Sequence, residues 1–306
     1  MKVTITGATG FVGREVVSKL VGGGHRVHVL ARTAPGDFPS SVAFSPWNAV
    51  SDPPPESIEG SDAVVHLAGE PVAQRWTAEA KARIRSSRIE GTRLLVNALA
   101  RQAQRPAVLV SASAIGIYGT RGDEILTEAS APGSGFLADL TLEWERAAQE
   151  AERLGIRVVA LRFGIVLGHG GALAKMLPPF RAGVGGRMGS GNQWVSWIHI
   201  DDAAGLALFT IQNAMVRGPV NATAPNPVTN REFTRELAAA LHRPAVFPVP
   251  RLALKLLFGE MADALVSSQR VLPRASEAAG FRFLYPDLGP ALAHILRGEK
   301  TGSERQ

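Results

Sequence analysis

Residues 1–32, MKVTITGATGFVGREVVSKLVGGGHRVHVLAR, decide the fold of this chain. The β-branched segment at residues 3–6 is typical of a buried strand. Glycines follow at positions 7, 10 and 13, and a helical pattern of valine and leucine continues to the glycine triplet at 22–24. Residues 26–30, RVHVL, supply a second strand. A strand, a glycine-rich turn, a helix and another strand within about thirty residues predict a βαβ unit of the dinucleotide-binding kind.

The three glycines have separate physical roles at this turn. Gly7 permits the tight turn, Gly10 lets a pyrophosphate approach the backbone, and Gly13 lets the helix lie against the strand. The first amides of the helix and its dipole favour the negative charge of that pyrophosphate. A purely structural strand-to-helix turn is the alternative. The residues that we expect to bind the cofactor here are Gly7, Thr9, Gly10, Phe11, Val12 and Gly13.

The residues after the second strand indicate which dinucleotide binds. NAD sites place a carboxylate about twenty residues past the glycines to bind the ribose hydroxyls, whereas a 2′-phosphate is bound by an arginine. This chain has Arg32 and Thr33 there and no acidic residue before Asp37. We therefore predict NADP(H), with Arg32 and Thr33 on the 2′-phosphate through charge-assisted hydrogen bonds. A solvated surface arginine is the alternative interpretation of Arg32.

The composition restricts the classes of function. The chain has 306 residues and no cysteine, which excludes disulfides, thiol nucleophiles and thiolate metal ligands. Its formal charge is +6, yet the basic residues are spread along the chain without a nucleic-acid-binding motif, so we expect no nucleic-acid partner. No segment has the roughly eighteen apolar residues of a membrane span, and no signal-peptide pattern precedes the first strand. We therefore expect a cytoplasmic protein with no membrane partner.

Three later strands end in small or polar residues. Ligands of open parallel sheets lie at the carboxyl ends of the strands, so the residues that follow each strand are candidates for the site. The strands expected at 63–69, 106–110 and 157–162 end in or lead to further residues that we assign to the cofactor, which are Leu67, Ala68, Gly69, Ser111 and Arg162. A structural ion pair is an equal alternative for Arg162. We interpret His66 as a packed strand residue.

Two long helices are predicted between these strands, at 77–104 and at 136–154. Arg75, Lys81, Arg85 and Arg88 lie in or just before the first half of the earlier helix, where they face either solvent or the phosphates of a dinucleotide. Beyond the last of the three strands, residues 183–193 contain five glycines, which favour a mobile flap over a ligand.

The segment His199-Ile200-Asp201-Asp202 carries three potential metal ligands. We interpret it as the start of a helix capped by Asp201 and Asp202, because no further histidine or acid lies nearby in the sequence. We therefore expect no metal site.

Alternating strands and helices up to about residue 170 predict an α/β fold with a Rossmann-type doubly wound parallel sheet. We assign residues 1–170 to the NADP-binding domain, with sheet elements returning at about 194–223. Residues 171–306 are expected to form mostly a smaller C-terminal substrate lobe and a helical segment.

The chain resembles the extended short-chain dehydrogenase/reductase superfamily. The resemblance rests on Thr6–Gly13 (TGATGFVG), His66–Gly69 (HLAG), Val110–Ser113 (VSAS), Leu161–Gly164 (LRFG) and Trp197–Asp202 (WIHIDD). More narrowly, it resembles the atypical branch of nucleoside-diphosphate-sugar epimerase-like or SulA-like cell-division-inhibitor homologues. The motifs shared with that branch include RWT at 75–77, SR at 87–88, NATAPNPV at 221–228 and GFRF at 280–283.

The resemblance implies a serine, a tyrosine and a lysine four residues after the tyrosine as the groups of hydride chemistry. Ser113 matches the serine, but Leu137 and Thr141 stand where the tyrosine and lysine are expected. The tyrosines are Tyr118 and Tyr285, and neither has a lysine four residues later. The usual mechanism needs a phenol acidified by an ammonium one helical turn away, so this chain requires another solution.

Three interpretations follow. In the first interpretation, Ser113 and Tyr118 form the catalytic pair; the alternative role of Tyr118 is that of an aromatic residue packed in its loop. In the second interpretation, a carboxylate, Asp139 or Glu143, is the acid or base; the alternative is that these two residues lie on exposed helix surface without a catalytic role. The third is a non-catalytic NADPH-binding sensor or protein-interaction module. We predict an NADP(H)-binding oxidoreductase or epimerase, monomeric or homodimeric, that acts on a small molecule, a nucleotide-sugar being one candidate.

Overall fold

The computed structural model describes residues 1–302, including the side chains of all of them except Leu257 and residues 298–302. Seven parallel strands form the central sheet, in the order β11-β7-β5-β4-β1-β2-β3. Its strands are Lys2–Thr6 (β1), Arg26–Ala31 (β2), Ala43–Pro46 (β3), Ala63–His66 (β4), Val108–Ala114 (β5), Arg157–Phe163 (β7) and Gly218–Ala222 (β11). This sheet confirms the predicted Rossmann-type fold class.

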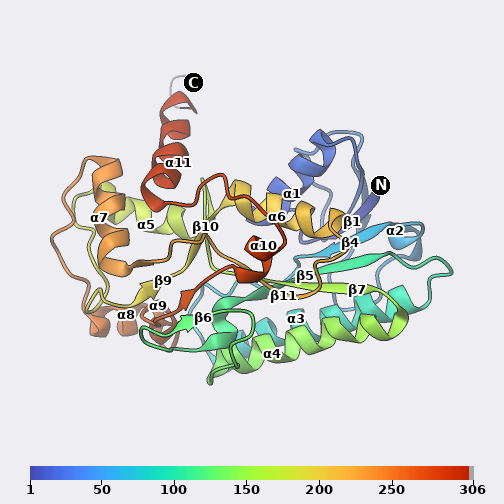
Figure 1. The fold of residues 1–306 in the computed structure, drawn as a ribbon, viewed down its shortest axis with the longest axis horizontal. Coiled ribbons are helices and arrows are strands. Elements are labelled where there is room, and N and C mark those ends of the chain that lie inside the picture. The colour runs from blue at the N-terminus through green and yellow to red at the C-terminus, as the bar shows by residue number, and fades with distance from the viewer. Residues whose placement is uncertain (303–306) are drawn as a thin grey trace.

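Helices cover both faces of the sheet (Figure 1). On one face lie Phe11–Gly22 (α1) and Ile200–Gln212 (α6), and on the other lie Ala78–Ala100 (α3) and Phe136–Gln149 (α4). Each strand alternates its side chains between these two layers, because successive residues of a strand point to opposite faces. Ile5 of β1 therefore packs with Val17 of α1, whereas Val64 of β4 packs with Leu99 of α3. The strands are buried on both faces, which explains their nearly continuous apolar sequences.

Capping groups and short turns set the ends of the elements. The hydroxyl of Thr77 accepts a hydrogen bond from the amide of Ala80 at 3.2 Å, so Thr77 is the N-cap of α3. The helix predicted at 136–154 divides into α4 and a 3-10 helix at Glu150–Leu154, and another 3-10 helix at Ile115–Tyr118 follows β5. A four-residue helix, Pro55–Ile58 (α2), begins on a proline, which fits the first helical position because the missing N–H has no partner there anyway.

A second group of elements packs beside the carboxyl edge of the sheet (Figure 1). Its helices are Gly171–Arg181 (α5), Asn230–Leu241 (α7), Arg251–Phe258 (α8), Met261–Leu265 (α9), Arg274–Ala278 (α10) and Leu288–Gly302 (α11). Its short strands are Ile125–Leu126 (β6), Ile165–Leu167 (β8), Trp194–Val195 (β9), Trp197–His199 (β10), Val228–Thr229 (β12) and Arg270–Val271 (β13). Leu173, Trp197, Leu237 and Leu292 belong to one buried apolar cluster that ties α5, α7 and α11 together.

One local expectation differs from the structure. The N-cap of α6 is His199, whose Nδ1 accepts the amide of Asp201 at 3.0 Å; Asp201 and Asp202 lie inside the first turn. The carboxylate of Asp202 instead accepts the backbone amides of Leu284 and Tyr285, at 2.7 and 2.9 Å. A histidine nitrogen can replace a capping oxygen because its unprotonated nitrogen is an acceptor.

The glycine-rich segment at 183–193 is anchored to its surroundings. The side chain of Asn230 accepts the amide of Met188 at 2.8 Å, and the carbonyl of Gly191 accepts the amide of Arg231 at 2.8 Å. These bonds tie the loop to the first turn of α7. That the segment is a mobile flap over a ligand stays a prediction. No helix among the described residues has the length and apolar character needed to cross a membrane.

Candidate functional site

In the turn between β1 and α1, two of the three glycines are too closely packed to carry a side chain, and the third has more space around it. Gly7 has a φ of +69°, and a Cβ there would lie 2.5 Å from the carbonyl carbon of Leu67. A Cβ on Gly13 would lie 2.3 Å from the carbonyl oxygen of Gly7. At Gly10 the tightest approach would be 3.1 Å, to that same oxygen. Gly7 and Gly13 therefore permit the close packing of turn and helix, and Gly10 leaves the first turn of α1 accessible to a phosphate.

A cavity of about 370 Å³ opens over this turn. Its volume lies within the roughly 300–1,000 Å³ usual for small-molecule sites. The walls come from the glycine turn, the end of β2, the segment after β3, the segment after β4 and the first half of α3. Gly7, Thr9, Gly10, Arg32, Leu67, Ala68 and Gly69 are among the lining residues. The structure thus brings together, around one hollow, residues that the sequence assigned to the cofactor from three separate segments.

Arg32 lies at the wall of this cavity that β2 supplies. Its side chain is exposed, and within the described part of the chain it has no hydrogen bond or ion pair. Asp37, the first acid after β2, is instead paired with Arg14 of α1. The cation at the end of β2 is therefore available to an anionic ligand. Glu70 also lines the cavity, from the segment after β4, and its carboxylate is engaged by Gln74 and Arg83. Thr33 is exposed next to it but is not part of the cavity wall.

Phe11 and Val12 lie at the start of α1 without lining the cavity. Carbon atoms of the Phe11 ring would be 2.7–2.9 Å from Cβ atoms placed on Gly168, Gly170 and Gly171, so this ring packs against the loop before α5. Val12 packs at the border of the core that includes Ile5. Their side chains are structural, so any contact of these two residues with a phosphate would come from their backbone amides.

His66 is a packed residue at the end of β4. It is fully buried, its Nδ1 lies 2.7 Å from the hydroxyl of Thr6, and its Nε2 lies 2.9 Å from the hydroxyl of Thr92. Burial, followed by the charge of Arg88, lowers the pKa of His66 to about 4. The ring therefore stays neutral at physiological pH and bridges β1 to α3.

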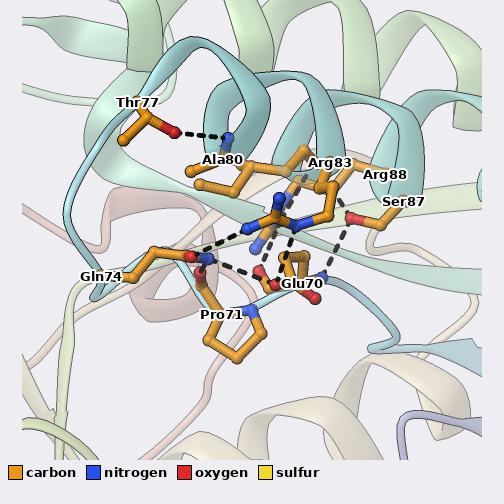
Figure 2. A network of polar contacts seen from close by, with 9 residues as sticks. Glu70, Pro71, Gln74, Thr77, Ala80, Arg83, Ser87 and Arg88 are labelled. Atoms are coloured by element: carbon orange, nitrogen blue, oxygen red, sulfur yellow. Dashed lines mark hydrogen bonds and ion pairs between the residues drawn. The ribbon is translucent and has the colours of Figure 1, made fainter.

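The four basic residues singled out in the sequence, Arg75 just before α3 and Lys81, Arg85 and Arg88 within it, fall into two groups. Three of them are satisfied by groups on the protein surface: the Leu256 carbonyl for Arg75, Glu260 for Lys81 and Glu143 for Arg85. Arg88 has no such carboxylate among the described residues. Burial, opposed by the charge of Glu70, lowers its pKa to about 10, so the guanidinium stays charged at neutral pH. Figure 2 shows Arg88 beside Glu70 and Ser87, while the carboxylate of Glu70 is directed to Gln74 and Arg83.

A second polar cluster lies at the carboxyl ends of β5 and β7. The hydroxyl of Ser113 donates to Oε1 of Glu145 at 2.5 Å, and Arg162 donates to both oxygens of Glu145 at 2.8 Å. Arg162 also donates to the hydroxyl of Tyr118 at 2.9 Å, and that hydroxyl donates to Asn221 at 2.7 Å. Burial alone would lower the pKa of Arg162, but the hydrogen bonds and charge of Glu145 raise it. The cluster is a buried ion pair whose oxygen and nitrogen atoms are satisfied by neighbours.

This geometry bears on the two catalytic candidates. Tyr118 is fully buried, and burial, only partly opposed by Arg162, raises the pKa of its phenol. A substitute acid needs access to substrate and a lowered pKa, so the surroundings of Tyr118 fit a packed loop aromatic better.

Ser113 is 3 % exposed and its hydroxyl is bound to Glu145. Arg162, assigned to the cofactor from the sequence, makes a structural ion pair, which was the alternative for it. Ser111 is also buried, and its hydroxyl bonds the carbonyl of Ala112 at 3.2 Å.

The positions of the absent tyrosine and lysine lie on α4. Leu137 packs against Gly116, because a Cβ placed on Gly116 would lie 3.1 Å from the Cβ of Leu137. Thr141 is buried, with 2 % of its surface exposed. On the same helix Glu143 is paired with Arg85, and Asp139 is exposed. Neither carboxylate lines the cavity over the glycine turn.

The structure also assembles groups that the sequence argument did not connect. His294 of α11 places its Nδ1 3.2 Å from Nε2 of His199, so with Asp201 three potential metal ligands lie within 4.8 Å of one another. Both ring nitrogens of His199 are already in hydrogen bonds, and Tyr285 stacks on its ring at 3.9 Å. Burial lowers the pKa of His199 to about 4. These contacts are consistent with helix capping, and the absence of a metal site stays a prediction.

Glu145 and Asn221 are the residues of the buried cluster that sequence reasoning missed as site residues. Glu145 did carry a signal, because it follows Trp144 on the apolar side of an amphipathic helix, where a carboxylate requires a partner. Asn221 carried none, because it joins the cluster from a strand 103 residues beyond Tyr118.

Comparisons with known proteins agree with this architecture. Residues 3–222 match the model of the NAD dependent epimerase/dehydratase family, and residues 249–295 match a domain of unknown function, DUF1731. Epimerase family protein YfhF of Bacillus subtilis is 39% identical over 302 residues, which cover 98% of this chain and 100% of that protein. The chloroplastic SDR39U1 homologue of Arabidopsis thaliana is 41% identical, over 97% of this chain and 87% of that protein.

Solved structures give the same result. The crystal structure of human epimerase family protein SDR39U1 (isoform 2) with NADPH superposes with a TM-score of 0.87 at 34% identity, covering 97% of this chain and 99% of that one. MoeE5 in complex with UDP-glucose and NAD has a TM-score of 0.81 at 22% identity over 99% of this chain and 100% of that one, and this likeness shows the fold alone. The chain belongs to the NAD dependent epimerase/dehydratase family of extended short-chain dehydrogenases/reductases.

Proposed function

We propose that this protein binds NADP(H) in the cavity over the glycine turn, with Arg32 on the 2′-phosphate. The observation that carries the proposal is an exposed, unpaired guanidinium in the cavity wall at the end of β2, where an NAD site needs a carboxylate. The nearest acid in sequence, Asp37, is held by Arg14. The human relative whose structure was solved with NADPH supports the same choice of cofactor.

The reaction that we propose is oxidoreduction or epimerisation of a small molecule, with a non-standard arrangement of catalytic groups. Membership of the epimerase/dehydratase family supports this class of chemistry. Ser113 lies at the carboxyl end of β5, where the superfamily resemblance places its serine. We assign the NADP(H) site to residues 1–170 with elements returning at about 194–223, and the substrate lobe mostly to 171–306.

A non-catalytic NADPH-binding sensor is the second candidate. It is favoured by the side chains of Leu137 and Thr141, which cannot transfer a proton at the positions of the absent tyrosine and lysine. The burial of Tyr118 points the same way, because its hydroxyl is already bonded to Arg162 and Asn221. A partner protein would then read the state of the cofactor.

Calorimetric titration with NADPH and NADH tests the cofactor proposal. We expect tighter binding of NADPH, and Arg32→Asp should reduce NADPH affinity by about 10- to 100-fold, because a charge-assisted hydrogen bond contributes about 1.5–3 kcal/mol. Arg26→Asp, at the amino end of the same strand and away from the cavity wall, is the matched control and should leave both affinities unchanged. Equal affinities of the native protein for the two dinucleotides would refute the assignment.

Turnover assays separate the two candidate functions. Purified protein is incubated with NADPH or NADP⁺ and panels of nucleotide-sugars, aldehydes and quinones, and cofactor absorbance and products are followed. Formation of any product supports the enzyme. Tight NADPH binding without turnover across the panels favours the sensor, and a pull-down with the NADPH-loaded chain is then the next measurement.

A further inference from the structure

A second cavity lies in the C-terminal group of elements, between α7 and the segment that follows this helix. Its volume is about 260 Å³, slightly below the roughly 300–1,000 Å³ usual for small-molecule sites. Three arginines, Arg187, Arg231 and Arg235, line it together with Thr234. The two cavities share no lining residue, and Figure 1 shows α7 at the end of the molecule opposite β1. This cavity is therefore separate from the proposed cofactor site.

The structure gathers the three arginines although Arg187 comes from a loop and the others from α7. A Cβ placed on Gly191 would lie 3.1 Å from Cδ of Arg187 and 3.4 Å from Cβ of Arg231. Both guanidinium groups donate to the carbonyl oxygen of Ser190, at 2.7 Å from Nη1 of Arg187 and at 3.4 Å from Nη2 of Arg231. Arg235 lies one helical turn after Arg231. Like charges at this spacing destabilise a helix, so the arrangement favours the presence of an anion.

The charges of Arg187 and Arg231 are not neutralised by the part of the chain that the structure describes. Arg187 also donates to the carbonyl oxygen of Gly189 at 2.9 Å, and Arg231 donates to the side-chain oxygen of Asn192 at 3.2 Å. These acceptors satisfy donors without carrying a charge. Nε and Nη2 of Arg187, and Nε and Nη1 of Arg231, make no hydrogen bond with any described residue. Each guanidinium thus keeps free donors for a ligand.

The two acids of α7 do not supply the missing charge. The carboxylate of Glu232 accepts the amide and the hydroxyl of Thr229, at 2.7 and 2.8 Å, in the capping box of the helix. Glu236 is paired with Arg235 at 3.2 Å, but these side chains are 36% and 71% exposed, so the pair contributes little. Neither acid lines the cavity.

Thr234 adds a polar group that has no partner. The residue is only 6% exposed, it lines the cavity, and its hydroxyl makes no hydrogen bond with any described residue. Threonine in a helix can bond the carbonyl three or four residues earlier, but this one does not. Among the described residues, no fully buried side-chain oxygen or nitrogen lacks a partner, so this hydroxyl must reach accessible space. The cavity that Thr234 lines provides that space.

The remaining lining is apolar, from Ala238, Ala245 and Val246. Cations and a free hydroxyl beside small apolar side chains fit a ligand with an anionic group and a short carbon skeleton. A phosphate monoester carries a charge of about −1.5 to −2 at neutral pH, and guanidinium groups bind its oxygens in a bidentate manner.

We propose that this cavity is a second ligand site, which binds a phosphate monoester of a small metabolite. Arg187 and Arg231 bind the phosphate oxygens, and the hydroxyl of Thr234 donates to one of them. Arg235 adds positive charge beside them, and the carbon skeleton lies against the apolar lining. The site does not depend on the proposed NADP(H) binding, because none of its residues lines the cofactor cavity.

Calorimetry at constant salt, with glycerol 3-phosphate as the probe and glycerol as its uncharged match, tests this site. The native chain should bind glycerol 3-phosphate saturably and glycerol not at all. Arg231→Met should weaken binding by about 10- to 100-fold, and Thr234→Val, of nearly the same shape, by about 2- to 10-fold. Arg217→Met, which removes an exposed arginine outside both cavities, is the control and should change nothing.

The Arg32→Asp protein separates the two sites, and it should bind glycerol 3-phosphate as the native chain does. Loss of binding in Arg32→Asp but not in Arg231→Met would place the phosphate in the cofactor cavity and overturn the inference. So would a native chain that takes up no glycerol 3-phosphate at millimolar concentration, or that binds glycerol equally well. Should Arg231→Met fail to fold, an unchanged affinity of Thr234→Val overturns the inference by itself. Failure to bind NADPH with glycerol 3-phosphate binding intact would refute only the proposed function.

Discussion

Replacing Glu145 by glutamine removes the charge that compensates Arg162 in the buried cluster. The two side chains are 5% and 8% exposed, and both oxygens of Glu145 accept hydrogen bonds from the guanidinium at 2.8 Å. A glutamine would keep the shape but turn an amide N–H₂ toward one of these donors. Breaking a buried pair by neutralising one partner typically costs about 3–5 kcal/mol, because the other charge stays buried. We expect Glu145→Gln to lose that amount of unfolding free energy.

Urea unfolding followed by circular dichroism measures this loss. The midpoint should fall while the slope with denaturant stays constant, which shows that stability rather than compactness has changed. Glu143→Gln is a matched control on the same helix, because the Glu143–Arg85 pair is 37% and 45% exposed and should contribute less than about 1 kcal/mol. The double variant Glu145→Met with Arg162→Met should be more stable than Glu145→Gln alone. Equal, small losses for Glu145→Gln and Glu143→Gln would refute this reasoning.

Three further changes are predicted. The pKa of His66 is about 4 in the folded chain against 6.5 ordinarily, so the unfolded chain binds more protons between these two pH values. This group should therefore lose about 3 kcal/mol of unfolding free energy as the pH falls from about 6.5 to about 4. Urea denaturation at several pH values should show a smaller loss of stability over this range for His66→Gln. Gly13→Ala places a methyl 2.3 Å from the Gly7 carbonyl and should lower both thermal stability and NADPH affinity, whereas Gly22→Ala in the same helix meets nothing within 4 Å and should not. Tyr118→Phe should lose about 1–3 kcal/mol of unfolding free energy through two broken hydrogen bonds; in turnover assays, a stable variant that has lost activity would instead favour the catalytic role.

The first βαβ unit could be predicted because its signals are local. Glycine spacing, β-branched strands and a helix between them all lie within a short segment. Gly7 and Gly13 have the geometric roles in the structure that the prediction gave them. Arg32 could be placed in the same way, since it directly follows β2. The helix predicted at 77–104 is observed as α3 at Ala78–Ala100, so its boundaries also follow the sequence signals to within a few residues.

The buried cluster could not be predicted in the same way because it is assembled by tertiary packing. Glu145 and Arg162 meet across 17 residues of sequence, and Tyr118 and Asn221 across 103. Nothing near Tyr118 in the sequence shows that an arginine and an asparagine will occupy its hydroxyl. His294 likewise reaches His199 only because α11 packs against α7 and β8. The cap of α6, which the sequence argument assigned to Asp201 and Asp202, is provided by His199 itself.

A crystal structure of the protein at saturating NADPH tests the central claim most directly. We predict density for the pyrophosphate over the first turn of α1 beside Gly10, with the 2′-phosphate in contact with the guanidinium of Arg32. An empty crevice at saturating NADPH, or a dinucleotide whose 2′-phosphate points away from Arg32 into solvent, would contradict it.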